Sequence, residues 1–543
     1  MWNSSRVLVL ALTSFLGLSA VAAGPQDAQT LQLESASPLR LHFTIKRASM
    51  FINGASQFDV FANPVLSGGN NVAFNGQVAF VDGTTVQKYV LADGVTYSVV
   101  QSDSANVAST VSCLPAAVIS PLQELVGAIN AATFVTNVVV DGQQVSCDAG
   151  SAYQIVFGGE TFALCAAKQA SGAGFKIYGS DLDIEAFYLS EAVSIAAPPL
   201  DAAVASTCEK VATTTTLTAV GKALLTGATV EATTPVASAN ATRVLTQNAE
   251  EATAAVAASS CACKGTVRPC IFIKGLGATD DSGLSDVDKT GYFGDIKNHA
   301  PCCSSVKFAM INTVDYPWTS ATQQQKVCDM AIAMSPTSSA STKTIDNTIV
   351  VAHSMGNLLL AGAIANGRCK LSSSSTWVGM SGPMKGSMAS DYLQNACSGN
   401  SNGLVSAVAN LIGRCPANAA IVSLAYEGAT YASGLDSQYV AAQNIYRSYV
   451  SAAMCSNAHD GLLSTDQVVF NLAATVINHK SKENDGLVEY QSCAGGFPTS
   501  KFGATYTSPF YVTKLNHADT RFLHGDALFN DAQKPVKWFE CLL

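Results

Sequence analysis

One short segment constrains the fold of this chain more than any other: a strand-like apolar run that leads through a serine turn into an apolar helix. Residues 348–352 carry the strand pattern, residues 353–356 the turn and residues 358–365 the helix. A strand that turns sharply into a helix needs small residues beside the serine, here Ala352 and Gly356, because the serine backbone is strained and the helix packs close. The segment therefore predicts a strand, a tight turn and a helix in succession.

Ser354 occupies the centre of this turn. The turn places it at a helix N-terminus, where backbone amides favour a developing negative charge. A similar spacing of small residues occurs around Ser194, but no comparable strand and helix flank it there. We therefore predict Ser354 as a nucleophile, and the alternative interpretation is an ordinary helix cap.

The sequence on either side of this turn alternates between strand-like and helical patterns. After Cys261, apolar and β-branched runs occur at residues 270–273, 306–311 and 376–380, separated by helical stretches. Such alternation is typical of a parallel sheet covered by helices. For residues 261–543 we predict an α/β fold, with a mostly parallel sheet and helices on both faces.

The first half of the chain has a different pattern. Residues 24–200 contain short aromatic and β-branched runs separated by turns rich in Gly, Asn and Asp, which predicts a β-rich antiparallel domain. No catalytic constellation occurs in it, so its role stays open. Residues 201–260 shift to Ala, Thr and Ser and hold a glycosylation sequon at Asn240, which predicts an exposed linker. One or two Ala-rich helices are the alternative for this segment.

The N-terminus indicates the compartment. Residues 1–23 contain Arg6, an apolar stretch and a small-residue exit near Ala22, which are the parts of a secretory signal peptide. A signal anchor is the alternative, although the stretch is marginal for a membrane span of about 20 residues. No other stretch is long and apolar enough to cross a bilayer. We therefore expect a secreted, extracellular protein with no transmembrane segment after cleavage.

The cysteines agree with an oxidising compartment. The chain has 16 of them, and disulfides form and persist mainly outside the cytosol. Four precede Ser260 and twelve follow it. Since both counts are even, each half can close its own disulfides.

The charge balance excludes one class of partner. The chain has 30 Lys and Arg against 39 Asp and Glu and no long basic run, so we expect no nucleic-acid partner. Only 13% of the residues are charged, and 48% are hydrophobic. This composition suits an enzyme with an apolar substrate.

A serine nucleophile needs an acid and a base, which follow it in sequence in an α/β-hydrolase. Asp485 lies in an Asn-Asp-Gly turn from which a carboxylate could face an imidazole, and His517 follows a strand-like run. Asp460, in a similar motif, and His524 compete with them. From the residues alone, Asp485 is equally consistent with a plain turn, and His517 with a surface histidine.

Five motifs, read in order, resemble those of the bacterial-type triacylglycerol lipases, which are α/β-hydrolases with a mobile lid. The resemblance extends from Pro269 to about Phe529, and five motifs in the correct order are a stronger signal than any one. The motifs are residues 273–277, 352–356, 381–387, 484–488 and 516–519. The resemblance implies Asp485 and His517, rather than Asp460 and His524, as the acid and base that serve Ser354.

The resemblance further implies an oxyanion hole formed by the backbone amides of Leu276 and Met355. Two residues depart from the family pattern: Lys274 stands where a histidine is usual, and Ala352 stands where a glycine is usual. Because the implied oxyanion donors are backbone amides, Lys274 need not abolish catalysis.

Members of this family often bind a structural calcium ion through an aspartate two residues after the base, which is the position of Asp519. Calcium prefers about six to eight oxygen ligands, and the sequence does not identify the others. The alternative is a carboxylate that orients a neighbouring group or caps a turn. Asp519 is therefore a candidate calcium ligand only, and we assign no cofactor.

Together these features predict a secreted serine carboxylic ester hydrolase, a lipase or esterase acting on acyl lipid esters. Two alternatives stay open: an acyltransferase on the same fold, and a lipid- or surface-binding protein in which the N-terminal domain carries the function. Residues 399–475 include the amphipathic stretch 403–413 and are predicted as a lid insertion that contacts lipid surfaces transiently. Ordinary helices of a cap are the alternative for this insertion.

Overall fold

The structure, a computed structural model, describes most of the chain. The predicted signal peptide, Asn240 and residues 400–405 of the predicted lid lie outside the described residues. The described residues are 36–67, 70–82, 85–102, 110–114, 120–147, 151–166, 173–200, 205, 208–210, 215–226, 253–256, 261–399 and 406–543.

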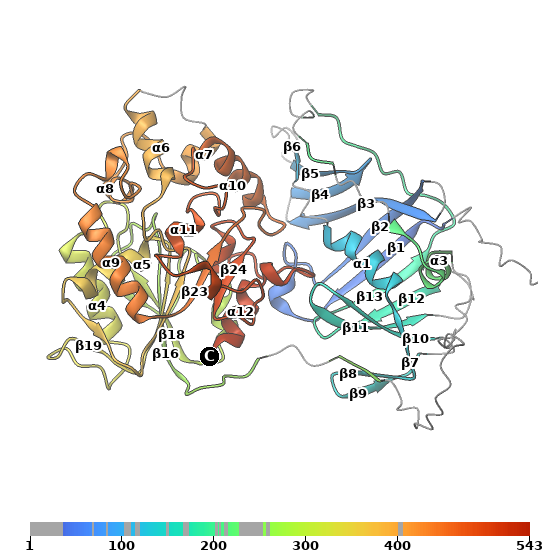
Figure 1. The fold of residues 1–543 in the computed structure, drawn as a ribbon, viewed down its shortest axis with the longest axis horizontal. Helices are drawn as coiled ribbons and strands as arrows, with labels where there is room; N and C mark the ends of the chain where they lie inside the picture. The colour runs from blue at the N-terminus through green and yellow to red at the C-terminus, as the bar shows by residue number, and fades with distance from the viewer. Residues whose placement is uncertain are drawn as a thin grey trace, which may run out of the picture.

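The N-terminal half contains a large antiparallel sheet, as the sequence predicts (Figure 1). Its main path runs in the order β6-β5-β4-β3-β2-β1-β13-β12-β11-β10-β7, and β14 pairs with β3. A smaller sheet has the order β15-β8-β9. The strands are β1 (Leu39–Ile45), β2 (Gln57–Leu66), β3 (Asn71–Asp82), β4 (Thr85–Ala92), β5 (Val95–Ser102), β6 (Thr110–Cys113), β7 (Thr133–Val135), β8 (Asn137–Val140), β9 (Gln143–Val145), β10 (Ala152–Phe157), β11 (Glu160–Ala166), β12 (Ala173–Tyr178), β13 (Leu182–Tyr188), β14 (Thr215–Thr216) and β15 (Thr253–Val256).

Alternation along the strands builds the core of this half. In β1, every second residue from Leu39 to Ile45 is buried, because successive side chains of a strand point to opposite faces. Two helices, α1 (Ser120–Asn130) and α3 (Ala219–Thr226), add Ile129 and Leu224 to the same core. Since α3 lies within residues 201–260, part of the segment predicted as a linker packs against the sheet.

The C-terminal half contains a seven-stranded mixed sheet flanked by helices. Its order is β17-β18-β16-β20-β22-β23-β24, and every neighbouring pair is parallel except β17 and β18. The predicted strands at residues 270–273, 306–311, 348–352 and 376–380 all fall in this sheet. The strands are β16 (Arg268–Ile273), β17 (Gly283–Ser285), β18 (Cys303–Met310), β20 (Ile349–His353), β22 (Thr376–Met380), β23 (Val450–Ser456) and β24 (Phe510–Thr513), and a two-stranded sheet joins β19 (Thr344–Ile345) to β21 (Lys370–Leu371).

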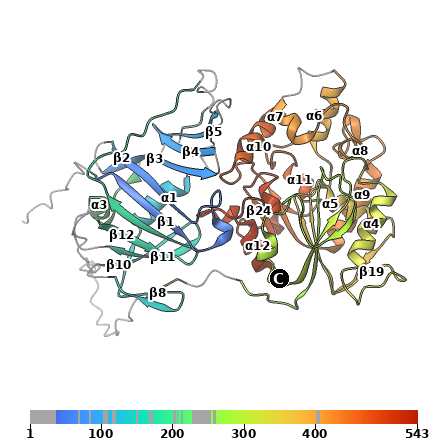
Figure 2. The same ribbon diagram turned by 180° about the vertical axis from the view of Figure 1, so that it is seen from behind.

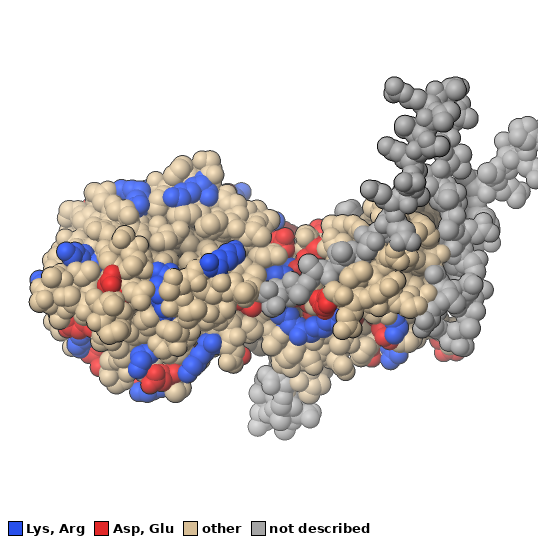
Figure 3. Space-filling view, turned by 90° about the horizontal axis from the view of Figure 1, so that it is seen from below, with Lys and Arg blue, Asp and Glu red and all other residues tan. Residues whose placement is uncertain are grey.

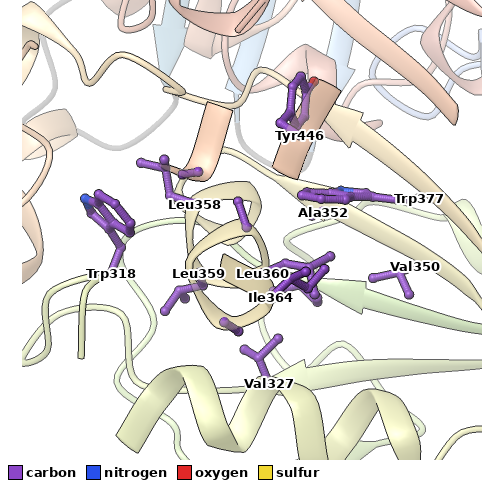
Figure 4. Close-up of a cluster of buried hydrophobic side chains, with 14 of the residues drawn as sticks. Trp318, Val327, Val350, Ala352, Leu358, Leu359, Leu360, Ile364, Trp377 and Tyr446 are labelled. Carbon is purple, nitrogen blue, oxygen red and sulfur yellow. The ribbon is translucent and has the colours of Figure 1, made fainter. Parts of the chain in front are cut away.

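The two faces of the sheet are covered by separate hydrophobic cores. Val350 and Ala352 of β20 join one core, whereas Val351 joins the other. Figure 4 shows the first core around α5 (Met355–Ala365), where Trp318 and Trp377 lie among its leucines. A strand buried on both faces reads as a continuous apolar run, which is why the sequence pattern identified β20. The other helices are α4 (Ala321–Ile332), α6 (Met388–Cys397), α7 (Ser406–Ile412), α8 (Ala419–Val422), α9 (Asp436–Tyr449), α10 (Thr465–Val476), α11 (Tyr490–Cys493) and α12 (Pro535–Leu542).

Eight disulfides pair all 16 cysteines, and none of them joins the N-terminal sheet to the C-terminal sheet. This confirms that each half closes its own bridges. In the portion of the chain that the structure describes, no helix has the length and apolar character needed to span a bilayer. The pairs are Cys113–Cys208, Cys147–Cys165, Cys261–Cys541, Cys263–Cys302, Cys270–Cys303, Cys328–Cys369, Cys397–Cys415 and Cys455–Cys493.

The two halves meet along the C-terminal segment, which lies beside the N-terminal sheet in both ribbon views (Figures 1 and 2). The ammonium group of Lys537 on α12 lies 2.9 Å from Glu160 and 2.8 Å from Asp181 of the N-terminal half. A second ion pair joins Arg47 of the N-terminal half to Asp526 of the C-terminal half, at 3.7 Å. Lys537, Asp181, Arg47 and Asp526 are buried, whereas other charged groups are scattered over the surface seen in Figure 3. Oppositely charged side chains therefore meet across the junction between the two halves.

Candidate active site

Ser354 occupies a strained turn between β20 and α5. Its φ of 53° lies in the left-handed region that non-glycine residues rarely adopt. A Cβ atom at Gly356 would lie 2.7 Å from the carbonyl oxygen of Lys274, and one at Gly275 would lie 2.5 Å from the Cβ of Ser354. Both positions therefore require glycine, because the loop after β16 passes directly over the turn.

Asn357, in the first turn of α5, braces this strained backbone. Its side-chain amide donates to the carbonyl oxygens of Ala352 at 3.0 Å, Ser354 at 3.3 Å and Met380 at 3.1 Å. Ala352, where a glycine is usual in the lipase pattern, is fully buried in the core beside α5. The turn thus accommodates the alanine, and Asn357 is a supporting residue that the motif alone did not identify.

The structure brings Ser354, His517 and Asp485 together from three loops. Nε2 of His517 lies 3.0 Å from Oγ of Ser354, and Nδ1 lies 2.8 Å from Oδ2 of Asp485. His517 follows β24, and Asp485 lies between α10 and α11. In this arrangement, Nε2 can take a proton from the serine while the carboxylate holds the other ring nitrogen.

Asp485 is held as a carboxylate in a buried position. Its Oδ1 accepts the backbone N–H groups of Leu487 at 3.0 Å and Val488 at 2.7 Å. Burial alone would raise the pKa of Asp485, but the charge of His517 and these hydrogen bonds outweigh it and lower the pKa. The carboxylate is therefore ionised at neutral pH and available to stabilise an imidazolium.

The competing residues, His524 and Asp460, lie outside the cavity that contains Ser354. Nδ1 of His524 lies 2.6 Å from Oδ1 of Asp519, and Nε2 of His524 lies 3.5 Å from Asp466. The backbone carbonyl of Asp460 accepts a hydrogen bond from Gln467. Neither His524 nor Asp460 lines the cavity that contains Ser354.

Both carboxylate oxygens of Asp519 have protein partners. Its Oδ1 faces His524, and its Oδ2 accepts the backbone N–H of Leu462 at 2.7 Å. Across the described residues, no group of three or more His, Cys, Asp and Glu side chains is arranged to hold a metal ion. The carboxylate orients neighbouring groups through these contacts, and calcium binding by Asp519 stays a prediction.

The two implied oxyanion donors border the serine. Leu276, in the loop after β16, lines the cavity in front of Ser354. Met355 is the first residue of α5, so its N–H has no acceptor within the helix. Backbone donors at a helix N-terminus and in an adjacent loop suit a developing oxyanion.

A chain of hydrogen bonds connects the loop after β16 to His517. The hydroxyl oxygen of Tyr292 accepts the N–H of Gly275 at 3.0 Å and lies 2.7 Å from Nδ1 of His353. Nε2 of His353 lies 3.1 Å from the hydroxyl of Thr520, which donates to the carbonyl oxygen of His517 at 3.0 Å. Neither Tyr292 nor Thr520 was identified from the sequence. His353, in contrast, lies within the predicted turn.

His353 is a neutral member of this chain. Burial, and then the charges of His517 and Arg521, lower its pKa well below the usual value for histidine. Since the Tyr292 oxygen already accepts from Gly275, its own hydrogen is free to be donated to Nδ1 of His353. Nε2 then carries the ring hydrogen and donates it to Thr520.

Lys274 helps to hold the loop after β16 in place. Its ammonium group is 1% exposed and lies 2.7 Å from both Asp288 and the hydroxyl of Thr290. The lysine is therefore held in a buried ion pair, and it does not line the cavity that contains Ser354. This geometry explains how the loop tolerates a lysine where a histidine is usual.

The cavity in front of Ser354, called here the serine cavity, has a volume of about 290 Å³. Apolar side chains from α7 and α10, including Leu411, Ile412 and Phe470, form part of its wall. These residues belong to the predicted lid insertion. An apolar wall opposite a nucleophile is suited to an acyl chain.

Comparisons with known proteins give only weak similarities. No protein-family model matches the chain, and no curated protein matches it. A metagenomic carboxyl esterase is 14% identical over 51% of this chain and 75% of its own, with a TM-score of 0.29. A lipase-esterase related protein from Clostridium acetobutylicum is also 14% identical, over 39% of this chain and 84% of its own, with a TM-score of 0.22. These TM-scores are too low to support a conclusion about function.

Proposed function

We propose that this protein is a serine carboxylic ester hydrolase of the lipase or esterase type, with an α/β-hydrolase fold in its C-terminal half. The observation that carries the proposal is the hydrogen-bonded succession of Ser354, His517 and Asp485 at the carboxyl ends of parallel strands. The chain order of nucleophile, acid and base agrees with that fold. The eight disulfides support a site of action outside the cell.

In the first half-reaction, His517 takes the proton of Ser354 as Oγ attacks the ester carbonyl carbon. Asp485 holds the imidazole in the required tautomer and stabilises the imidazolium. The amides of Leu276 and Met355 donate to the oxyanion, and removing one such donor typically costs about 3–4 kcal/mol of transition-state stabilisation. His517 then returns the proton to the alcohol as it leaves, and an acyl-serine remains.

In the second half-reaction, water enters and His517 takes one of its protons. The resulting hydroxide attacks the acyl carbon. As the tetrahedral intermediate collapses, the bond from the acyl carbon to Oγ breaks and His517 returns the proton to Oγ, which releases the carboxylic acid and restores Ser354. The apolar wall of the serine cavity supports an acyl chain as the substrate group. Residues 399–475 would act as the lid of this cavity.

The test uses a fluorophosphonate probe and a series of nitrophenyl acyl esters. We expect Ser354→Ala to abolish labelling and to lower kcat by at least about 10⁴-fold, because the nucleophile is lost. Ser194→Ala is the matched control, since Ser194 has similar neighbours in sequence and lies outside the site. Labelling that survives Ser354→Ala contradicts the proposal.

Product analysis separates hydrolysis from acyl transfer. With glycerol present, we expect free carboxylic acid as the main product. A new glyceryl ester as the main product would instead assign the chain to the acyltransferases, which share the same first half-reaction.

A further inference from the structure

A second cavity lies between the N-terminal sheet and the segment that follows His517, and we call it the sheet cavity. Its volume is about 430 Å³. The sheet contributes Val60, Val78 and Tyr89, and the opposite wall contains Leu523 and Leu528. It has no lining residue in common with the serine cavity. The sheet cavity is therefore a separate space, formed where the two halves meet.

The sheet cavity has a neighbour in the interior of the N-terminal half. A smaller cavity of about 110 Å³ shares Val60, Val78 and Tyr89 with it and extends to Leu125 of α1 and Leu225 of α3. Small-molecule sites usually have volumes of about 300–1,000 Å³ and mainly apolar walls. The combined space thus suits a long apolar chain.

One polar group in this apolar space lacks a partner. Tyr89 is 3% exposed, and its hydroxyl has no hydrogen-bond partner in the described part of the chain. Burial raises the pKa of Tyr89, so the hydroxyl keeps its proton and can donate. Because buried polar groups are nearly always hydrogen-bonded, a ligand oxygen in the cavity is suited to accept from this hydroxyl.

The charges around the sheet cavity disfavour an anionic ligand. Two of its lining residues, Asp295 and Asp526, are acidic. Nearby basic side chains already face carboxylates: Arg47 pairs with Asp526, and Nδ1 of His524 lies 2.6 Å from Asp519. His299, which also lines the cavity, lies 3.9 Å from Glu540. A buried carboxylate on the ligand would therefore lack an uncommitted cation among these groups.

We propose that the sheet cavity binds a long-chain lipid that carries an uncharged oxygen, an alkyl ester or a fatty alcohol. The chain fills the space between Val60 and Leu528, and Tyr89 donates its hydroxyl hydrogen to the lipid oxygen. This binding does not require Ser354, so it stands apart from the proposed hydrolysis.

The test measures binding with the full-length Ser354→Ala variant, which cannot hydrolyse an ester by the proposed mechanism. N-phenyl-1-naphthylamine, an uncharged probe that fluoresces in apolar sites, is bound and then displaced. We expect 1-hexadecanol and methyl palmitate to displace it, and palmitate at about pH 8 to be at least about tenfold weaker because its carboxylate is charged. Comparing 1-hexadecanol with methyl palmitate shows which of the two lipids binds more tightly. Displacement by palmitate as strong as that by the uncharged lipids overturns the proposal.

Two substitutions locate the bound lipid. Val60→Trp fills the sheet cavity and is expected to abolish displaceable binding, whereas Leu411→Trp, which fills the serine cavity, is expected to leave it unchanged. Loss of binding in Leu411→Trp with retention in Val60→Trp places the lipid in the serine cavity and overturns the proposal.

Tyr89→Phe tests the hydroxyl without changing the shape of the cavity. We expect hexadecanol to bind about fivefold more weakly, the usual effect of losing one neutral hydrogen bond. Tyr97→Phe, on the next strand and outside the cavity, is the matched control. In the background with Ser354 present, ester hydrolysis is expected to be unchanged by Tyr89→Phe, so failure of lipid binding is distinguishable from failure of the hydrolase proposal. Equal hexadecanol affinity in Tyr89→Phe and the parent protein contradicts the assignment.

Discussion

The hydroxyl of Tyr292 lies 2.7 Å from Nδ1 of His353, the residue directly before Ser354. The same oxygen accepts the N–H of Gly275, which precedes the implied oxyanion donor Leu276. Tyr292 therefore couples the position of the oxyanion loop to the position of the serine turn. We infer that it is a positioning residue, since it touches neither the nucleophile nor the base through a hydrogen bond in the described structure.

Tyr292→Phe removes only this hydroxyl. We expect kcat for a nitrophenyl ester to fall about 10–100-fold with little change in KM, because small displacements of catalytic groups weaken the transition state more than substrate binding. Tyr316→Phe is the control, since Tyr316 is 41% exposed. A rise in KM at unchanged kcat would contradict the positioning role.

Asp485→Asn keeps the shape of the acid and removes its charge. His517 then loses the anion that holds its tautomer, so we expect kcat to fall about 10⁴-fold. Steady-state hydrolysis and a thermal unfolding curve distinguish lost chemistry from lost fold. Asp460→Asn, in the similar motif, is expected to retain activity, and the reverse result would make Asp460 the acid.

The lowered pKa of His353 predicts how the free energy of unfolding depends on pH. Its pKa in the folded protein is well below the ordinary value, mainly because of burial, so below about pH 6.5 the unfolded chain binds a proton that the folded protein does not. The free energy of unfolding should therefore decrease as the pH falls below about 6.5, by up to about 1.4 kcal/mol per pH unit from this residue.

Denaturant unfolding at several pH values measures this slope. We expect a shallower slope for His353→Gln than for the parent protein. His42→Gln, which changes a half-buried histidine beside Asp59, is the control. Identical slopes for the parent and His353→Gln would show that His353 is not the group that titrates.

Phe529 joins the two halves of the molecule. It belongs to the C-terminal segment but packs in the N-terminal core, with its ring centroid 4.9 Å from that of Phe157 and 6.2 Å from that of Phe43. Phe529→Ala should lower the free energy of unfolding by about 3–5 kcal/mol, because a buried aromatic ring is lost. In contrast, Phe134→Ala, at a ring that is 49% exposed, should have a much smaller effect in the same denaturant titration.

Much of the architecture was accessible from local sequence patterns. The alternation of strand-like and helical stretches predicted the mainly parallel sheet, and short runs separated by turns predicted the antiparallel one. Cysteine parity similarly predicted that each half closes its own disulfides. The order of five motifs selected Ser354, Asp485 and His517, and their side chains lie within hydrogen-bonding distance.

The residues that support the site could not be identified in this way. Tyr292 and Thr520 meet at His353 from segments far apart in the chain, and neither belongs to a local pattern that would mark it. Their roles depend on which loops the sheet brings side by side. The contact of Asp519 with Leu462 likewise joins segments far apart in the chain.

The sequence by itself determined the strand and helix patterns and the serine turn. These depend on side-chain periodicity and on motifs of a few residues, which neighbouring positions encode. The tertiary structure alone decided the network through Tyr292, the packing of Phe529 into the N-terminal core and the cavity beside Tyr89. Each of these arises from long-range packing, in which one segment meets another that no local rule connects to it.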